Sequence, residues 1–323
     1  MSFFGGGTDM EDYFKLHKGA VLSTTFDKYC YVTVRHLPGF FDYKTELAYS
    51  QIERVNETEE IRHPAIRNAM KMLDMTRIRL TYEADLPARS GLGTSSSFAV
   101  GMLNAFHALK GQYANQRKLA DEAIWLERTL CGEAGGWQDQ IAAAFGGFNR
   151  IDFHEEGYEV SPVIISPKRK KMLNENLLMF FTGFSRNSSE IQRLNEISKG
   201  KNHGILRKMY ELVGQAEEIL TDESRELDDF GKLLDLTWKM KKQSGKAVST
   251  ENIERIYEKG MKAGALGGKL LGAGGGGFIL FYVPPDRQKD VKKALDDLLC
   301  IPFEFENSGS RVVYYAPELD PRL

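Results

Sequence analysis

The spacing of apolar residues along the chain predicts a mixture of strands and helices. Alternating or continuous apolar runs predict strands at residues 20–26, 29–35, 46–50, 78–84, 148–153, 177–182, 278–283 and 311–316. Helical spacing and helix-forming composition predict helices at residues 10–16, 64–73, 98–109, 115–130, 137–145, 204–220, 226–243, 250–263 and 287–299. This order of elements favours an α+β chain.

Two local patterns add connections to this outline. The strands at residues 20–26 and 29–35 are separated by Asp27 and Lys28, which predicts a hairpin. The basic run PKRKK at residues 167–171 is typical of a solvated turn. Because 323 residues exceed the usual size of one domain, we place a boundary at this run, with domains at residues 1–168 and 169–323.

The stretch at residues 87–98 (PARSGLGTSSSF) has the composition of a phosphate-binding loop. It connects a predicted strand to a predicted helix and places two glycines before four hydroxyl residues. Glycines let the backbone turn closely around a ligand, and the free N–H groups at a helix start attract an anion. The structural alternative is a turn before a helix that one hydroxyl side chain caps. No Gly-Lys-Ser/Thr sequence closes the loop, so it is not a Walker A motif.

Two further glycine-rich stretches lie at residues 5–9 (GGGTD) and 267–277 (GGKLLGAGGGG). Taken alone, Asp9 at the end of the first stretch is typical of a helix N-cap. In the second stretch, Gly272, Gly274 and Gly277 have the spacing of a dinucleotide fingerprint. That fingerprint needs a helix directly after the glycines, whereas a strand is predicted here, so we reject a Rossmann site.

Composition narrows the classes of function. The formal net charge of −2 gives no overall basic surface, which argues against nucleic acid as the main partner. A small anionic substrate needs only a local positive field and remains compatible. Cys30, Cys131 and Cys300 form no CxxC pair, so neither a zinc site nor a disulfide framework is indicated, and a reducing cytoplasm is expected. No apolar run approaches 18 residues, so neither a membrane span nor a signal segment is expected.

Three motifs resemble those of one family. The spacing P-x-x-x-G-L-G-T-S-S-S resembles the nucleotide-binding motif of the GHMP sugar and mevalonate kinases, with Thr94 and Ser95 at the family's paired serines. The run GAGGGG before a strand resembles the family's third motif, a backbone-lined loop that closes over the substrates. The segments FFGGGTD, GGWQDQIAAAFGG and FTGFSR are similar to the heptose-phosphate branch of the family. The motifs occur in the family's order, and the resemblance extends from Phe3 to about Tyr282.

The resemblance implies a fold and an activity. The implied fold is the two-domain α+β GHMP kinase fold, with a mixed α/β nucleotide-binding N-terminal domain, a ferredoxin-like C-terminal domain and the active site in the cleft between them. The implied activity is ATP-dependent phosphorylation of the anomeric hydroxyl of a sugar phosphate. A fucose-type or other sugar-1-kinase is the first alternative, and a non-catalytic sugar and ATP sensor is the second.

The resemblance also implies roles for individual residues. Asp139 would be the catalytic aspartate, although an acid in the first turn of a helix is also favourable for the helix dipole alone. Ser95 and Glu127 would hold Mg²⁺, a hard cation that prefers oxygen ligands. The spacing between Glu127 and Asp139 differs by one residue from that in mevalonate kinases. The residues implied in ATP binding are Pro87, Ser90, Gly91, Leu92, Gly93, Thr94, Ser95, Ser96 and Ser97.

The substrate side is implied in the same way. A carboxylate at Asp9 is suited to accept from two vicinal sugar hydroxyls. Arg186 could pair bidentately with a substrate phosphate, while a surface arginine is the structural alternative. The residues implied in substrate binding are Gly7, Thr8, Asp9, Arg186, Gly274, Gly275 and Gly276.

One expected group has no counterpart in the sequence. In the heptose-phosphate branch an arginine lies just before the segment that begins here at Ser2, and the chain has only Met1 there. Related sugar kinases use that arginine to stabilise the transferred charge. A truncated start and a real loss both account for this difference. The sequence also leaves open the exact sugar, the anomer, and whether the protein is a monomer or a homodimer.

Overall fold

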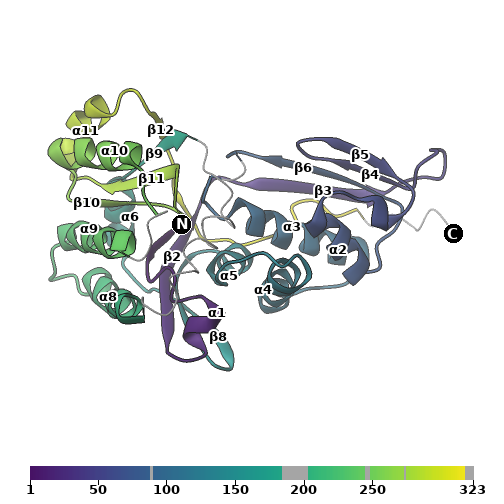
Figure 1. Ribbon diagram of the computed structural model, residues 1–323, viewed down its shortest axis with the longest axis horizontal. Helices are drawn as coiled ribbons and strands as arrows, with labels where there is room; N and C mark the ends of the chain where they lie inside the picture. The colour runs from purple at the N-terminus through teal and green to yellow at the C-terminus, as the bar shows by residue number, and fades with distance from the viewer. Residues whose placement is uncertain (88–89, 184–202, 244–247, 273, 317–323) are drawn as a thin grey trace.

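The computed structural model describes residues 1–87, 90–183, 203–243, 248–272 and 274–316. Figure 1 shows two parts, each with its own arrangement of helices and sheet, and the region around β2 joins them. The described strands form three sheets, one in each part and one between them. No helix in this described portion is long and apolar enough to cross a membrane.

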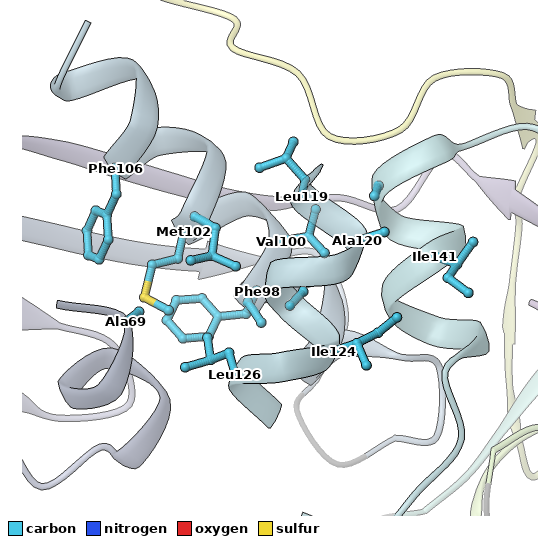
Figure 2. Close-up of a cluster of buried hydrophobic side chains, with 14 of the residues drawn as sticks. Ala69, Phe98, Val100, Met102, Phe106, Leu119, Ala120, Ile124, Leu126 and Ile141 are labelled. Atoms are coloured by element: carbon cyan, nitrogen blue, oxygen red, sulfur yellow. The ribbon is translucent and has the colours of Figure 1, made fainter. Parts of the chain in front are cut away.

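The first sheet has the strand order β3-β6-β4-β5. Strands β4 and β6 are parallel, and the other neighbouring pairs are antiparallel. Helices cover one face of this sheet (Figure 1), and their apolar side chains interlock beneath it (Figure 2). The elements are β3 (Cys30–His36), β4 (Thr45–Ala48), β5 (Ile52–Val55), β6 (Ile78–Ala84), α2 (Pro64–Met72), α3 (Thr94–Leu109), α4 (Gln116–Ile124) and α5 (Gln138–Phe145).

The second sheet has the order β1-β2-β7-β8, and β13 adds to β2. The predicted hairpin between residues 20–26 and 29–35 is wrong, because β2 pairs with β1, β7 and β13 while β3 pairs with β6. Asp27 and Lys28 instead carry the chain from one sheet to another. The elements are β1 (Ser2–Phe4), α1 (Glu11–Phe14), β2 (Gly19–Phe26), β7 (Phe148–His154), β8 (Gly157–Pro162) and β13 (Phe305–Glu306).

The third sheet is fully antiparallel, with the order β10-β11-β9-β12. In the chain, β9 is the first of these strands, β10 the second, β11 the third and β12 the fourth. In the sheet they lie in the order second, third, first, fourth, which is the strand order of a ferredoxin-like domain. Helices α8, α9 and α10 lie between the first two strands in the chain, and α11 precedes the last. The elements are β9 (Leu177–Gly183), α8 (His203–Thr221), α9 (Asp228–Gln243), α10 (Glu251–Lys262), β10 (Gly267–Leu270), β11 (Gly277–Tyr282), α11 (Gln288–Ala294) and β12 (Leu299–Ile301).

Two predictions near the ends of the second half are wrong. The basic run at residues 167–171 is the first turn and a half of helix α6 (Pro167–Glu175) and not a turn between strands. Ser166 caps this helix by accepting from the Arg169 N–H at 3.2 Å, and Pro167 occupies its first position. Residues 311–316 form no strand. The chain instead forms the short strands β12 and β13 before that segment.

A shared apolar core joins the two predicted domains. The Phe230 ring of α9 lies edge-on to Phe3 and Phe4 of β1, with centroids 5.4 and 5.0 Å apart. All three side chains are fully buried. Burial of this kind contributes about 2 kcal/mol per large side chain, so β1 is held firmly against α9. The boundary at residue 168 stays a prediction, and the segment that follows β1 lies at the junction.

Candidate active site

The predicted phosphate loop ends in a glycine with left-handed backbone. Helix α3 begins at Thr94, and its N-cap is Gly93, whose φ is 69°. No side chain of the described residues caps this helix and its N-cap is a glycine, so the alternative in which a hydroxyl residue is the cap is wrong. The amide groups at the start of a helix have no partner within it. The start of α3 therefore presents uncapped N–H groups, as an anion site requires.

The serines of the loop point to a buried carboxylate. Ser95 Oγ donates to Glu127 Oε1 at 2.9 Å, and Ser96 Oγ donates to Glu127 Oε2 at 2.7 Å. Gln140 Nε2 of α5 also donates to Glu127 Oε2. Glu127 is 1% exposed, while Ser95 is exposed and Ser96 is buried. The pair implied in metal binding, Ser95 and Glu127, is therefore brought together.

Glu127 reaches this position from an unusual helical turn. Helix α4 continues as a π-helix, η2 (Trp125–Leu130), and the Cys131 N–H bonds to the Leu126 carbonyl five residues earlier. A π-helix contains one more residue per hydrogen-bonded turn than an α-helix. This extra residue explains why Glu127 lies one step off the apolar stripe of the helix.

Asp139 lies in the first turn of α5, directly opposite the phosphate loop. A Cβ added to Gly93 would be 3.2 Å from Asp139 Cγ, so the carboxyl group faces the start of α3. Gly93, Thr94, Ser97 and Asp139 line the same hollow, together with Met1. Asp139 is exposed to the solvent that fills this hollow. Protein atoms nevertheless surround its carboxyl group closely, and the resulting loss of hydration raises the pKa of Asp139. The charge of Asp9 raises that pKa further, and the charge of Arg128 lowers it.

Asp9 is 1% exposed and connects two loops of the site. Its Oδ1 accepts from the Gly7 N–H at 2.9 Å, and its Oδ2 accepts from the Gln138 N–H at 3.2 Å. Asp9 does not cap the nearby helix α1, whose N-cap is Met10, so the N-cap hypothesis is wrong. Its carboxylate instead satisfies a free N–H at the start of α5. Burial raises its pKa, and the two backbone hydrogen bonds lower it.

Thr8 fixes the conformation of the same loop. Its Oγ1 donates toward the Gly5 carbonyl at 2.7 Å and the Ala20 carbonyl at 2.9 Å, and it accepts from the Ala20 N–H at 3.0 Å. The residue is fully buried. Its hydroxyl therefore shapes the turn that presents Gly7 and Asp9.

Two buried polar atoms near this loop have no hydrogen-bond partner within the part of the chain that the structure describes. They are Ser2 Oγ and Gln138 Oε1. A Cβ added to Gly6 would be 3.9 Å from both Ser2 Oγ and Gln138 Nε2, so both side chains border the glycine loop. A buried polar atom without a partner is costly, and a polar ligand would remove that cost. Neither residue was identified from the sequence.

The two glycine loops of the chain contact each other through their backbones. A Cβ added to Gly272 would be 2.4 Å from Gly91 Cα, and one added to Gly277 would be 2.1 Å from the Ser90 carbonyl oxygen. Gly274, Gly275 and Gly276 follow between these contacts with positive φ. The phosphate loop and the third motif therefore lie in direct backbone contact.

Two cations of the site were missed in the sequence. The Arg128 guanidinium donates to the carbonyls of Glu133, Ala134 and Gly136 at 3.2 Å, and its charge lowers the pKa of both Asp9 and Asp139. Lys269 is 4% exposed and donates to the Ser2 and Phe3 carbonyls at 2.7 and 2.9 Å. Arg128 directly follows Glu127 in the sequence, and this adjacency could have identified Arg128 as a residue near the site. Lys269 lies inside the third motif, but nothing in the surrounding sequence indicates that its side chain contacts β1.

The remaining predicted residues fall into two groups. Pro87 and Leu92 are half-buried at the two ends of the phosphate loop, and Ser90 is buried between them. Its Oγ has no partner among the described atoms. Arg186 lies outside the described residues.

The donor set at Glu127 fits a magnesium ion. The described residues contain no group of three or more His, Cys, Asp or Glu able to hold a metal. Mg²⁺ does not need such a group, because it keeps several waters and takes one or two protein oxygens beside substrate phosphates. Ser95 Oγ and Glu127 Oε1, 2.9 Å apart at the edge of the phosphate loop, are oxygens of this kind.

Comparison with known proteins agrees with the fold. Residues 60–147 match the family model of the GHMP kinases N terminal domain, and residues 216–299 match that of the GHMP kinases C terminal domain. The chain therefore belongs to the GHMP kinases. It is a phosphotransferase that uses ATP and has an alcohol group as acceptor, so the hypothesis of a non-catalytic sensor is set aside.

Within the family, the chain is similar to proteins that act on different alcohols. It is 33% identical over 312 residues to D-glycero-alpha-D-manno-heptose 7-phosphate kinase of Campylobacter jejuni, covering 90% of this chain and 89% of that protein. It is 27% identical to the bifunctional fucokinase/GDP-fucose pyrophosphorylase of Arabidopsis thaliana, covering 70% of this chain and 22% of that protein. A D-glycero-D-manno-heptose 1-phosphate kinase from Bacteroides thetaiotaomicron has the same fold, with a TM-score of 0.77 at 24% identity, covering 96% of this chain and 94% of that one.

Proposed function

We propose that the protein phosphorylates the anomeric hydroxyl of D-glycero-D-manno-heptose 7-phosphate, with ATP and Mg²⁺, and forms the 1,7-bisphosphate. The observation that carries this proposal is the 33% identity to the Campylobacter heptose 7-phosphate kinase along nine tenths of the chain. The geometry around Asp139 supports it, because a carboxylate faces the start of the helix that follows the phosphate loop.

In this proposal Asp139 orients the anomeric hydroxyl and accepts its proton. The hydroxyl oxygen forms a bond to the terminal phosphorus of ATP as the bond from that phosphorus to the ADP oxygen breaks. A general base works best with a pKa near the working pH, and burial raises the pKa of Asp139 in that direction. Phosphoryl transfer requires mostly positioning and charge stabilisation, so one such base is sufficient.

The nucleotide phosphates would lie at the start of α3. The backbone N–H groups of residues 90–97 would hold them, and Gly91 and Gly93 leave room because they carry no side chain. Ser95 and Glu127 would hold Mg²⁺, which neutralises phosphate charge when it is bound. The contact of Gly272 and Gly277 with the phosphate loop supports a closed site in which Gly274 to Gly276 lie near the reacting groups.

The sugar would bind beside the first glycine loop. Asp9 accepts one backbone N–H on each carboxylate oxygen, and each oxygen has a second lone pair for a sugar hydroxyl. Ser2 Oγ and Gln138 Oε1, which have no partner among the described residues, lie at the same place and would bond further hydroxyls. Gly7 would contribute backbone only. We keep Arg186 as the proposed partner of the substrate phosphate.

A fucose-type sugar-1-kinase is the alternative, and the similarity to the Arabidopsis fucokinase favours it. Both reactions attach phosphate to an anomeric oxygen. They differ in whether the acceptor already carries a phosphate group.

The product identifies the reaction directly. Incubation with ATP, Mg²⁺ and heptose 7-phosphate, followed by ³¹P NMR, is expected to give one new phosphate signal coupled to the anomeric proton. The signal of the 7-phosphate should persist. A new signal coupled to another sugar proton, or ATP hydrolysis without any sugar product, would contradict the proposed function.

A further inference from the structure

The loop at residues 132–136 connects the π-helical turn that carries Glu127 to helix α5, and Arg128 holds this loop. The Arg128 guanidinium donates to three of its carbonyls, each at 3.2 Å, those of Glu133, Ala134 and Gly136. The loop lies directly against the guanidinium, because a Cβ added to Gly135 would be 2.9 Å from Arg128 Cζ. The donors of a guanidinium are fixed in one plane, so several carbonyls bonded to it are fixed relative to one another. One side chain therefore sets the path of the loop.

The same loop also lies against Asp9. A Cβ added to Gly136 would overlap the Asp9 carboxylate, so the backbone of the loop packs directly on that group. The next two residues bond Asp9 as well, since the Trp137 N–H donates to its carbonyl and the Gln138 N–H donates to its Oδ2, both at 3.2 Å. Asp139 follows in the first turn of α5. The loop contacts the guanidinium and this carboxylate, and its path determines how Asp9 and Asp139 lie relative to each other.

We infer that Arg128 is a positioning residue, which holds this loop so that Asp9 and Asp139 lie correctly for the sugar acceptor. The inference rests on the proposed function for the roles of these two carboxylates. It does not extend to the nucleotide, because no hydrogen bond joins Arg128 to residues 90–97 in the part of the chain that the structure describes. Arg128 should therefore govern the binding of the acceptor and not that of ATP.

The charge of Arg128 acts on the same two carboxylates. Burial raises the pKa of Asp9 and of Asp139, and the charge of the guanidinium lowers both. The other charged groups that interact with Asp139 are the Met1 amino group, Asp9, Glu127 and Lys241. Arg128 therefore affects the site in two separable ways, through the backbone of the loop and through its charge.

The first test measures ligand binding by calorimetry without Mg²⁺. Arg128→Met removes the guanidinium, so the Kd values for heptose 7-phosphate and for unphosphorylated heptose should both rise by about 10- to 100-fold. The Kd for a non-hydrolysable ATP analogue should stay within about threefold of the wild type. Arg67→Met is the matched control, because the Arg67 guanidinium of α2 also donates to a backbone carbonyl, that of Ile61, at 2.7 Å. Sugar affinities that match those of the control, or an equal loss of nucleotide affinity, would overturn the inference.

Arg128→Lys separates the two effects, because lysine keeps the charge but not the planar arrangement of donors. Removal of the charge in Arg128→Met should raise the pKa of Asp139. The acidic limb of kcat against pH should then move to higher pH, since Asp139 accepts a proton only when it is ionised. Arg128→Lys should return this limb to its wild-type position, while the Kd for the sugar stays raised. An equal displacement of the limb in both variants would show a merely structural role and overturn the inference.

A second pair of variants needs no ligand and covers the case in which Arg128→Met does not fold. Gly135→Ala places a methyl group against the guanidinium from the side of the loop. Gly132→Ala is its control, because Gly132 also has a positive φ but no atom of the described residues lies within 4 Å of its added Cβ.

Hydrogen exchange of these two variants, measured by mass spectrometry, reports the opening of each segment. Exchange at residues 5–9 and 133–139 should be faster in Gly135→Ala than in Gly132→Ala, while residues 93–98 keep the wild-type rate. Equal exchange in the two variants would overturn the inference. If the expected pattern is found but the wild type does not phosphorylate heptose 7-phosphate, the proposed substrate fails while the positioning of the loop by Arg128 stands.

Discussion

At the scale of single residues, the site is built from carboxylates whose environments differ. Glu127 accepts from two serines and a glutamine, Asp9 accepts from two backbone N–H groups, and Asp139 faces the phosphate loop. Burial raises the pKa of Asp9 and Asp139. Asp139 is the one of these two that solvent reaches, so a substrate hydroxyl can reach it as well.

Replacing Asp139 should separate binding from turnover. Asp139→Asn keeps the shape of the side chain and removes the base, so kcat should fall by about 100-fold or more. The Kd for the sugar, measured by calorimetry, should change by less than about threefold. Turnover near the wild-type rate would remove Asp139 from the mechanism.

The same variant should be more stable than the wild type above the raised pKa of Asp139. Because the pKa of Asp139 is raised on folding, the folded protein binds more protons than the unfolded chain between about pH 4 and that raised pKa. The free energy of unfolding of the wild type therefore falls as pH rises through this window, relative to Asp139→Asn. Urea unfolding of both proteins at several pH values measures the difference. A constant difference across the window would contradict the raised pKa.

The two serines that bond Glu127 should have different effects. Ser95 is exposed at the loop and is the proposed Mg²⁺ ligand, whereas Ser96 is buried. Ser95→Ala should raise the Mg²⁺ concentration needed for half-maximal activity, and Ser96→Ala should lower stability by about 1 kcal/mol with little change in the Mg²⁺ response. Magnesium titrations of activity and thermal unfolding of both variants measure these effects. Equal Mg²⁺ responses would argue against Ser95 as a ligand.

At the scale of elements, the sequence predicts strands and helices better than their partners. Residues 78–84 are predicted and observed as β6, and helices α8, α9 and α10 lie within two residues of their predicted bounds. The helix predicted at residues 287–299 is shorter, because α11 ends at Ala294 and strand β12 begins at Leu299. The hairpin at Asp27 and Lys28 fails because alternation identifies a strand but not the sheet to which it belongs. The basic run at residues 167–171 is helical because Ser166 and Pro167 start a helix, and this local signal outweighs its charge.

The same limit applies to the site. Gly91, Gly93, Ser95 and Asp139 are identified from motifs, because glycine spacing and hydroxyl runs have a local physical meaning. Lys269 has no such signal. Nothing in its local sequence indicates that the folded chain brings its ammonium group to the Ser2 and Phe3 carbonyls.

Contact between the two glycine loops should be sensitive to a single methyl group. Gly277→Ala would place Cβ 2.1 Å from the Ser90 carbonyl oxygen, so the third motif would have to move away from the phosphate loop. The KM for ATP should rise at least about tenfold, which corresponds to about 1.4 kcal/mol. Gly111→Ala is the matched control, because Gly111 also has a positive φ of 68° but no atom of the described residues lies within 4 Å of its added Cβ. Similar KM values for the two variants would show that the contact is not needed for ATP binding.

At the scale of the whole molecule, apolar packing and several hydrogen bonds hold the elements around the site together. Phe3 and Phe4 of β1 pack on α9, and Lys269 donates to the carbonyls of β1. The glycine loop after β1 and the start of α5 are joined through Asp9. Elements from both predicted domains therefore contribute to the candidate site.

The central claim is that this site phosphorylates a sugar that already carries a phosphate. The most direct measurement is kcat/KM for heptose 7-phosphate, for the unphosphorylated heptose and for fucose under the same conditions. A phosphate group that pairs with a site cation should contribute a preference of about 100-fold or more for heptose 7-phosphate, since a charge-assisted hydrogen bond contributes about 1.5–3 kcal/mol and the dianion can accept several. Equal kcat/KM for the two heptoses, or a preference for fucose, would contradict the account and assign the protein to the fucose-type kinases.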